Sequence, residues 1–228
     1  MRVDHEETLL IPAGRKELEA ELIIPADATG LIIFAHGSGS PHHQPRNARV
    51  GAAMREGGFG TLMLDFLTAD EERQAALDAH PRFDVPLLAS RLGEVTEWIR
   101  GRRAVSELRL GYFGVGSGAA AALIAASRRP RLVHAIVSRG GRPDLARDAL
   151  DRVQAPTLLI VGGEDDTVLE LNKDAYERIP SAKQLAIVPE ASHLFEEPGA
   201  LEQVAKLAEG WFREHLAANP EPSLFMRL

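Results

Sequence analysis

Three short segments of the chain contain residue types that together can cleave an acyl bond. A glycine-rich run, LGYFGVGSGA, holds Gly116 and Ser117, an acid stands at Asp165 after VGGE, and a histidine stands at His193 in ASHLFEEP. A hydroxyl nucleophile, a histidine that takes its proton and a carboxylate that orients the histidine are the three groups of a Ser-His-Asp site. The residue types therefore predict hydrolytic chemistry at a site built from separate segments.

The first segment has the pattern of a sharp turn between a strand and a helix. Glycines stand at positions 111, 114, 116 and 118, between an apolar run and a run of small residues. A turn that presents a nucleophile has the pattern G-x-S-x-G, because the backbone packs closely on both sides of it. With Gly114 and Gly118 as the flanking glycines, the nucleophile position is 116, and this chain has glycine there.

The missing hydroxyl at Gly116 leaves several routes open. Ser117 is adjacent, but a hydroxyl just after the turn ordinarily caps or supports the helix. For Ser117 to attack, the turn would have to shift by one residue, which puts Val115 and Ala119 where the close-packed glycines belong. A water molecule in place of the side chain, deprotonated by the histidine, is a second route. A protein that binds its ligand without turnover, or one whose serine was replaced, fits the sequence as well.

A second glycine-rich turn follows an earlier apolar run. Residues 35–40 read AHGSGS. Backbone N–H groups in such a turn, here those of Ser38 and Gly39, can point at the negative oxygen that develops during acyl transfer. The turn is therefore a candidate oxyanion hole, and His36 is a candidate substrate contact beside it.

Arginines stand near the predicted ligand-binding edge. Arg46 follows the second glycine-rich turn, and Arg139 and Arg142 flank the glycines of SRGGRPD. Ligands of α/β sheets bind at the carboxyl ends of the strands, where a guanidinium can hold a carboxylate or phosphate. We expect Arg46 and Arg142 to contact the substrate. The alternative is an ion pair with a nearby acid, one of Asp65, Asp84 and Asp144.

Short apolar runs predict the strands that position these groups. The short segment between the first two runs begins with PAG, a spacing that permits only a tight turn and so predicts an antiparallel hairpin. The later runs are almost continuously apolar, which is typical of parallel strands covered on both faces. The eight predicted strands are 7–11, 18–24, 31–35, 60–65, 108–113, 133–138, 157–161 and 184–188.

Helical periodicity appears between these strands. Apolar residues near a spacing of 3.6 predict core-facing helices, and the alanine-rich run after Gly118 predicts a helix that lies close to the sheet. Residues 68–84 are polar and predict either a solvated helix or a flap, while the tail 219–228 ends in apolar residues that dock on the body or on a partner. The predicted helices are 45–56, 86–101, 117–129, 168–179 and 199–217.

Composition restricts the class of protein. The 228 residues are 45% hydrophobic and 26% charged, as in an ordinary globular protein. The net charge of −7 removes the attraction to phosphate backbones or anionic membranes that a basic protein would have. The chain has no cysteine, so disulfides, thiolate metal sites and a cysteine nucleophile are excluded. The start lacks the pattern of a signal peptide, and we expect a cytoplasmic protein.

Two other functions match parts of the sequence. The run from Gly114 to Ala119 also satisfies G-x-G-x-x-G/A, the dinucleotide fingerprint, although at least three strands precede it and no acid ends the next strand. His36, His42 and His43 are close enough in sequence to suggest zinc, but they belong to a turn and to a polar loop. We expect no metal and no cofactor.

The chain resembles the dienelactone hydrolase-like branch of the α/β-hydrolases. The resemblance runs through FAHGSGS, GYFGVGSGAAAAL, VSRGGRPDLA, TLLIVGGEDDTV and SHLFEEPGAL, in the order nucleophile, acid, histidine that is typical of these enzymes. It implies that Asp165 is the acid and His193 the base, and that the backbone N–H of Ser117 and one from the Ser38 and Gly39 turn bind the oxyanion. The departure is Gly116, where the family has its serine.

The sequence therefore predicts one α/β-hydrolase domain over residues 1–228, with a mostly parallel sheet of about eight strands, helices on both faces and a minimal cap. The implied activity is hydrolysis of a carboxyl ester or lactone, impaired or atypical because of Gly116. The alternative is a non-catalytic binder of small molecules. The expected partner is a small ester or lactone, with no nucleic acid or membrane, in a monomer or homodimer.

Overall fold

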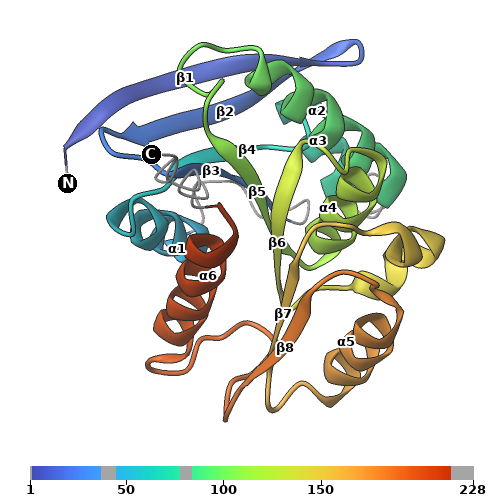
Figure 1. Cartoon of the computed structure of the whole chain (residues 1–228). Coiled ribbons are helices and arrows are strands. Elements are labelled where there is room, and N and C mark those ends of the chain that lie inside the picture. Colours follow the sequence, from blue (N-terminus) through green and yellow to red (C-terminus); the bar gives the residue numbers. More distant parts are fainter. Residues whose placement is uncertain (1, 37–44, 78–83, 217–228) are drawn as a thin grey trace, which may run out of the picture.

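The computed structural model describes residues 2–36, 45–77 and 84–216. Eight strands form one sheet in the order β1-β2-β4-β3-β5-β6-β7-β8 (Figure 1). β1 pairs antiparallel with β2, β2 pairs antiparallel with β4, and every later pair is parallel. The bounds are β1 Val3–Ala13, β2 Lys16–Pro25, β3 Gly30–Ala35, β4 Gly60–Leu64, β5 Arg109–Val115, β6 Val133–Arg139, β7 Thr157–Gly162 and β8 Lys183–Val188.

The hairpin and the parallel strands confirm the predicted sheet. β1 and β2 run longer than expected, so the turn narrows to Gly14 and Arg15, and Gly14 has a φ of +63°. Glycine adopts that φ without steric cost. All side chains of β3, β4 and β7 are buried, because helices cover both faces of the parallel part.

Helices on the two faces divide the core in two. α1 and α6 cover one face and share a core with Phe34, Phe113 and Ile160. α3, α4 and α5 cover the other face, where the alanines of α4 pack against Leu110 and Ile136. The helices are α1 Pro45–Glu56, α2 Ala69–Leu77, α3 Val85–Arg100, α4 Ser117–Arg128, α5 Asp166–Arg178 and α6 Ala200–Leu216.

Two further segments lie outside the regular alternation of strands and helices. Of the two alternatives predicted for the polar stretch 68–84, the described part forms a helix, α2, and Arg91 ties its first turn to the body by donating to Glu71 (2.7 Å) and to the Phe66 carbonyl (2.6 Å). A 3-10 helix, η2 (Pro143–Arg152), follows β6 and was not predicted. Within the described ranges, no helix is both long and apolar enough to cross a bilayer.

Candidate active site

A sharp turn at Gly116 connects β5 to α4 at the carboxyl edge of the sheet. Gly116 has φ 56° and ψ −125°, a backbone conformation that is strained for any residue with a side chain. A Cβ built on Gly116 meets no heavy atom within 4 Å. The turn therefore has open space where a side chain at this position would project, and nothing in the described residues fills it.

The glycines on both sides fix the register of this turn. A Cβ on Gly118 would lie 2.0 Å from the Ala35 carbonyl oxygen, and one on Gly114 would lie 2.5 Å from the Cα of Ala119. Both contacts are to backbone, so they are not relieved by moving a side chain. A turn shifted by one residue would place side chains in these positions, and the distances disfavour the shift that a nucleophilic Ser117 requires.

His193 and Asp165 form a close pair on the neighbouring loops. His193 Nδ1 lies 2.6 Å from Asp165 Oδ2. The Asp165 side chain also accepts from the backbone N–H of Val168 (3.4 Å) as the N-cap of α5. The acid is 14% exposed and the imidazole 50% exposed. With Nδ1–H donating to the carboxylate, Nε2 is the nitrogen that can accept a proton.

The pairing with His193 distinguishes Asp165 from its acidic neighbours in the sequence, Glu164 and Asp166. The end of β7 and the histidine loop pack backbone against backbone: the N–H of Glu164 donates to the Ala191 carbonyl at 3.0 Å, and a Cβ on Gly162 would lie 2.3 Å from that same oxygen. Gly162 is thus required for the close approach, a role that the sequence reasoning missed although GGED signalled a tight turn.

The loop after β6 lies between the turn and the histidine. The backbone N–H of Arg142 donates to the Gly116 carbonyl (3.0 Å), while a Cβ on Gly140, at φ +50°, would lie 3.7 Å from His193 Cε1. One loop therefore touches both halves of the site. The Arg142 side chain makes two bonds to Asp144, each 2.8 Å, and this hydrogen bonding raises its pKa.

Arg139 is the buried cation of the site. It is 5% exposed, and across the described ranges neither its Nε nor its Nη1 has a hydrogen-bond partner. Its guanidinium lies 5.8 Å from the centre of the Phe195 ring. Burial, with a smaller contribution from the charge of Arg46, lowers its pKa to about 10. Sequence reasoning noted Arg139 without placing it among the substrate contacts.

The other predicted residues have different surroundings. Arg46 donates to the Leu194 carbonyl (3.4 Å) and to Glu196 (3.0 Å), so it is attached to the histidine loop. A cavity of about 490 Å³ lies beside that loop and α1. His36 is 2% exposed at the end of β3, and Asp84 caps α3. Outside the described residues lie Ser38, Gly39, His42, His43 and the tail 219–228.

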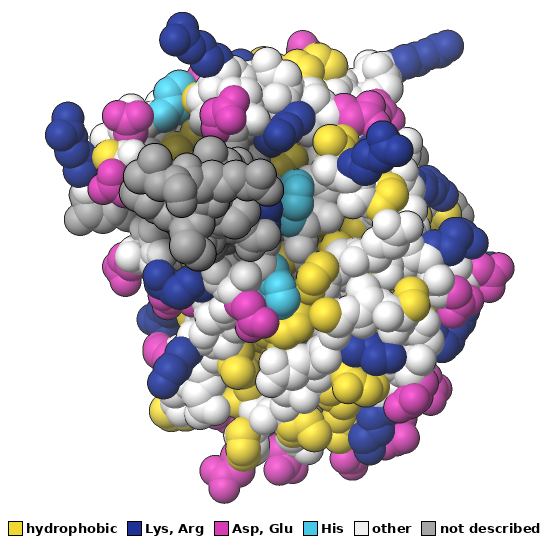
Figure 2. Space-filling view, viewed as in Figure 1, with side chains coloured by type: hydrophobic (Ala, Val, Ile, Leu, Met, Phe, Trp, Pro, Cys, Tyr) yellow, Lys and Arg dark blue, Asp and Glu magenta, His cyan; other side chains and the backbone are white. Residues whose placement is uncertain are grey.

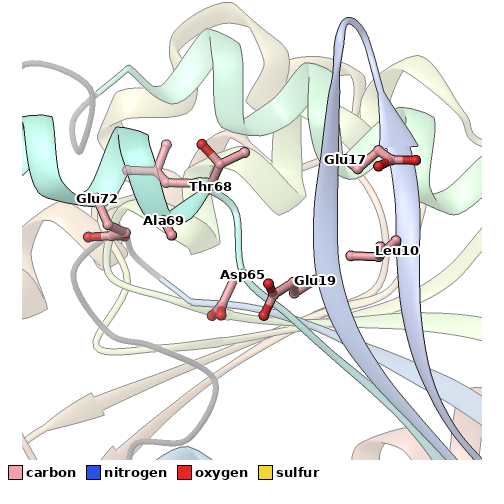
Figure 3. A pocket seen from close by; sticks show the side chains of 8 residues that line it. Leu10, Glu17, Glu19, Asp65, Thr68, Ala69 and Glu72 are labelled. Carbon is pink, nitrogen blue, oxygen red and sulfur yellow. The ribbon is translucent and has the colours of Figure 1, made fainter.

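A second cavity, of about 260 Å³, lies where β4 ends (Figure 3). Its wall combines the hairpin with the start of α2, and the side chains of Asp65 and Glu19 lie next to each other on one side of it. In the parts of the chain that are described, no three metal-ligating side chains come together. The cavity is lined by Leu10, Glu17, Glu19, Asp65, Leu67, Thr68, Ala69 and Glu72.

Comparisons with known proteins agree with this architecture. A model of the dienelactone hydrolase family matches residues 18–216. The crystal structure of a dienelactone hydrolase from Anabaena variabilis is 49% identical with a TM-score of 0.92, covering 95% of this chain and all of that one. Est1E from Butyrivibrio proteoclasticus shares only the fold, at 16% identity and a TM-score of 0.76, covering 91% of this chain and 98% of its own.

Two Mycobacterium tuberculosis proteins with a provisional phosphoribosyl transferase name are 51% identical over 218 residues. The match covers 96% of this chain and 48% of each relative. The chain therefore spans about half the length of the curated relatives it matches.

Proposed function

Because the chain belongs to the dienelactone hydrolase family, we propose that it binds a carboxyl ester or lactone at the Gly116 turn and hydrolyses it through water that His193 activates. The single observation that carries the proposal is the 2.6 Å pair between His193 Nδ1 and Asp165 Oδ2 at the edge where the strained turn lies. The chemistry needs no covalent intermediate, since position 116 offers no hydroxyl.

The proposed reaction uses the pair as a general base and then as an acid. His193 Nε2 takes a proton from water while the water oxygen bonds to the carbonyl carbon, and Asp165 stabilises the imidazolium that forms. The negative oxygen of the tetrahedral intermediate accepts from the backbone N–H of Ser117, the first residue of α4, where helix N–H groups lack intrahelical partners. Collapse breaks the C–O bond, and His193 returns its proton to the leaving alkoxide.

The expected rate is low. In dissected triads, loss of the nucleophile costs on the order of a million-fold in turnover, and the oxyanion hole and binding retain roughly a thousandfold or more over water. We propose the Ser38 and Gly39 turn as the second oxyanion donor, as the resemblance implies. Near the histidine loop, Arg139 has donors with no partner among the described residues, so it supports binding of substrates that carry a negative charge.

One observation favours a second candidate, a binder without turnover. Gly114 and Gly118 keep the close packing of the turn even though Gly116 presents no nucleophile. A cleft preserved in this way can serve recognition alone.

Gly116→Ser tests whether the site lacks only the nucleophilic hydroxyl. The open space at position 116 accommodates a hydroxymethyl group, and we expect ester hydrolysis to rise by roughly a thousandfold or more. A fluorophosphonate probe should then add its mass at position 116 of the variant and nowhere in the parent chain. Gly116→Ala is the matched control, since it carries the same backbone strain without the hydroxyl. If the serine variant is folded and as inactive as the alanine variant, the hydrolytic proposal is wrong.

A further inference from the structure

A groove of about 670 Å³ runs between α6 and β8, away from the candidate active site. β8 ends the sheet, and no described strand pairs with its outer side. In Figure 2, hydrophobic side chains gather in the lower half of the face, where Figure 1 places α6, β7 and β8. Ile187 is 47% exposed there. The groove is lined by Leu158, Gln184, Ala186, Ile187, Gln203, Lys206, Leu207, Gly210, Trp211 and Glu214.

The two edges of the sheet differ in how they are protected. β1, at the opposite edge, carries Asp4, His5, Glu6 and Glu7, and charges on an edge strand discourage pairing with another chain. β8 carries one charge, Lys183, followed by five uncharged residues. An uncharged edge with an apolar groove beside it is typical of a surface that another protein covers.

α6 presents a self-complementary stripe to this groove. The exposed positions recur at spacings of three and four residues, so they lie on one face of the helix. The stripe has Lys206 near its beginning, Glu214 near its end and Gly210 midway, four residues from each. When two such helices cross antiparallel at the glycine, each lysine comes opposite the other helix's glutamate, about 6 Å from the crossing point.

Among the described residues of its own subunit, no packing contact explains the glycine at position 210. A Cβ there would meet nothing within 4 Å, and glycine in an exposed helix interior is less stable than alanine. A glycine at a helix crossing lets two backbones approach closely, so the explanation lies in a second helix outside the subunit.

We propose that two copies of the chain form a dimer in which their α6 helices cross antiparallel at Gly210. The partner's α6 occupies the groove and covers Ile187. Lys206 of each subunit faces Glu214 of the partner subunit, which gives two equivalent ion pairs. The charge pattern selects a second copy because it complements itself under a two-fold rotation. This dimer is independent of the proposed chemistry, since none of the catalytic segments lines the groove.

Gly210→Cys tests the crossing point directly. The chain has no cysteine, so any disulfide must join the introduced residue to its own copy. We expect covalent dimers under mild oxidation, because residues at the two-fold axis face each other within disulfide range. Asp174→Cys, exposed on α5, is the control and should stay monomeric on denaturing gels. Equal cross-linking of both variants, or of neither, overturns the crossing point.

Charge reversal tests the partner. Light scattering after gel filtration should show a dimer for the full chain, roughly tenfold weaker dimerisation for Lys206→Glu, and recovery in Lys206→Glu/Glu214→Lys. The two residues are two helical turns apart, so recovery cannot come from within one helix. A monomer at every concentration overturns the dimer and leaves the groove for a different partner. The α6 interface is also overturned if Lys206→Glu does not weaken dimerisation, or if Lys206→Glu/Glu214→Lys does not restore it.

Discussion

The turn at Gly116 and the pair of His193 with Asp165 are the two halves of the proposed site, and they differ in the groups that they supply. The pair has both its geometry and its chemical groups, with 2.6 Å between imidazole and carboxylate. The turn has its geometry alone, since Gly114 and Gly118 hold the backbone in place and position 116 carries no side chain. Backbone packing, and not a hydroxyl, therefore holds the turn, and we expect that a serine placed at position 116 would not require the turn to be rebuilt.

We expect the largest effect when the pair of His193 with Asp165 is broken in the Gly116→Ser variant. In Gly116→Ser, we expect Asp165→Asn to lower kcat by roughly 10⁴, because the amide disfavours the tautomer in which Nε2 accepts the serine proton. In the parent chain the same change should cost much less, since no hydroxyl depends on the pair. The measurement is kcat on an activated ester for the four proteins, and equal losses in both backgrounds would show that the turn and the pair do not act together.

The second largest effect is expected on stability, where a substitution at Gly118 tests whether close backbone packing holds the turn. Gly118→Ala should lower the free energy of unfolding by roughly 3 kcal/mol, because its Cβ would lie 2.0 Å from the Ala35 carbonyl oxygen and backbone must move. Gly101→Ala is the control, with φ −72° and its nearest contact at 3.4 Å, and should change stability by less than about 0.5 kcal/mol. Urea unfolding measures both, and similar values would mean that the turn tolerates side chains.

The strands and helices around the site were largely predictable from the sequence, but the pairing of side chains within the site was not. Apolar runs identify each strand because the parallel sheet is buried on both faces, and α1 has the predicted bounds of 45–56. The 3-10 helix η2 was not predicted, because it contains a kink at Arg147, with φ 48°, and no hydrophobic periodicity indicates such a kink.

Within the site, the order of the motifs along the chain predicted an acid near position 165 and the histidine at 193. Sequence alone does not distinguish Asp165 from the adjacent acids Glu164 and Asp166. The N-cap geometry at Asp165 decides which one faces the histidine. Likewise, the sequence indicated an ion pair with Asp144 as the alternative to substrate contact, and the structure shows that pair for Arg142. The sequence could not say that Arg139 is buried with donors that have no partner among the described residues, because burial of a long side chain is set by elements distant in sequence.

An ion pair between Arg91 and Glu71 ties α2 to α3, outside the proposed site. Arg91 is nearly buried and Glu71 accepts from it, which lowers the pKa of Glu71 to about 2. A carboxyl whose pKa falls on folding contributes stability above its ordinary pKa near 4.5, and the contribution is lost as the pH falls from there toward 2. Glu71→Gln should cost about 2 kcal/mol at pH 7, because it leaves a buried guanidinium unpaired.

Thermal unfolding of Glu71→Gln and the parent chain across that pH range measures the effect. The two stabilities should converge as the pH falls, since protonation removes from the parent what the substitution removes from the variant. A constant difference at every pH would assign the loss to packing or to the Thr68 hydrogen bonds of Glu71.

The smallest effect is expected for Arg142, which touches the turn through its backbone and Asp144 through its side chain. Its guanidinium is 44% exposed, so Arg142→Ala should cost less than about 1 kcal/mol, and the backbone bond from its N–H to Gly116 should remain. In Gly116→Ser, the substitution should leave kcat nearly unchanged if the side chain serves only the ion pair. A rise in KM for anionic esters that is absent for neutral esters would instead show that the Arg142 side chain leaves Asp144 to bind the substrate. The Arg142 loop would then take part in substrate binding as well as in supporting the turn.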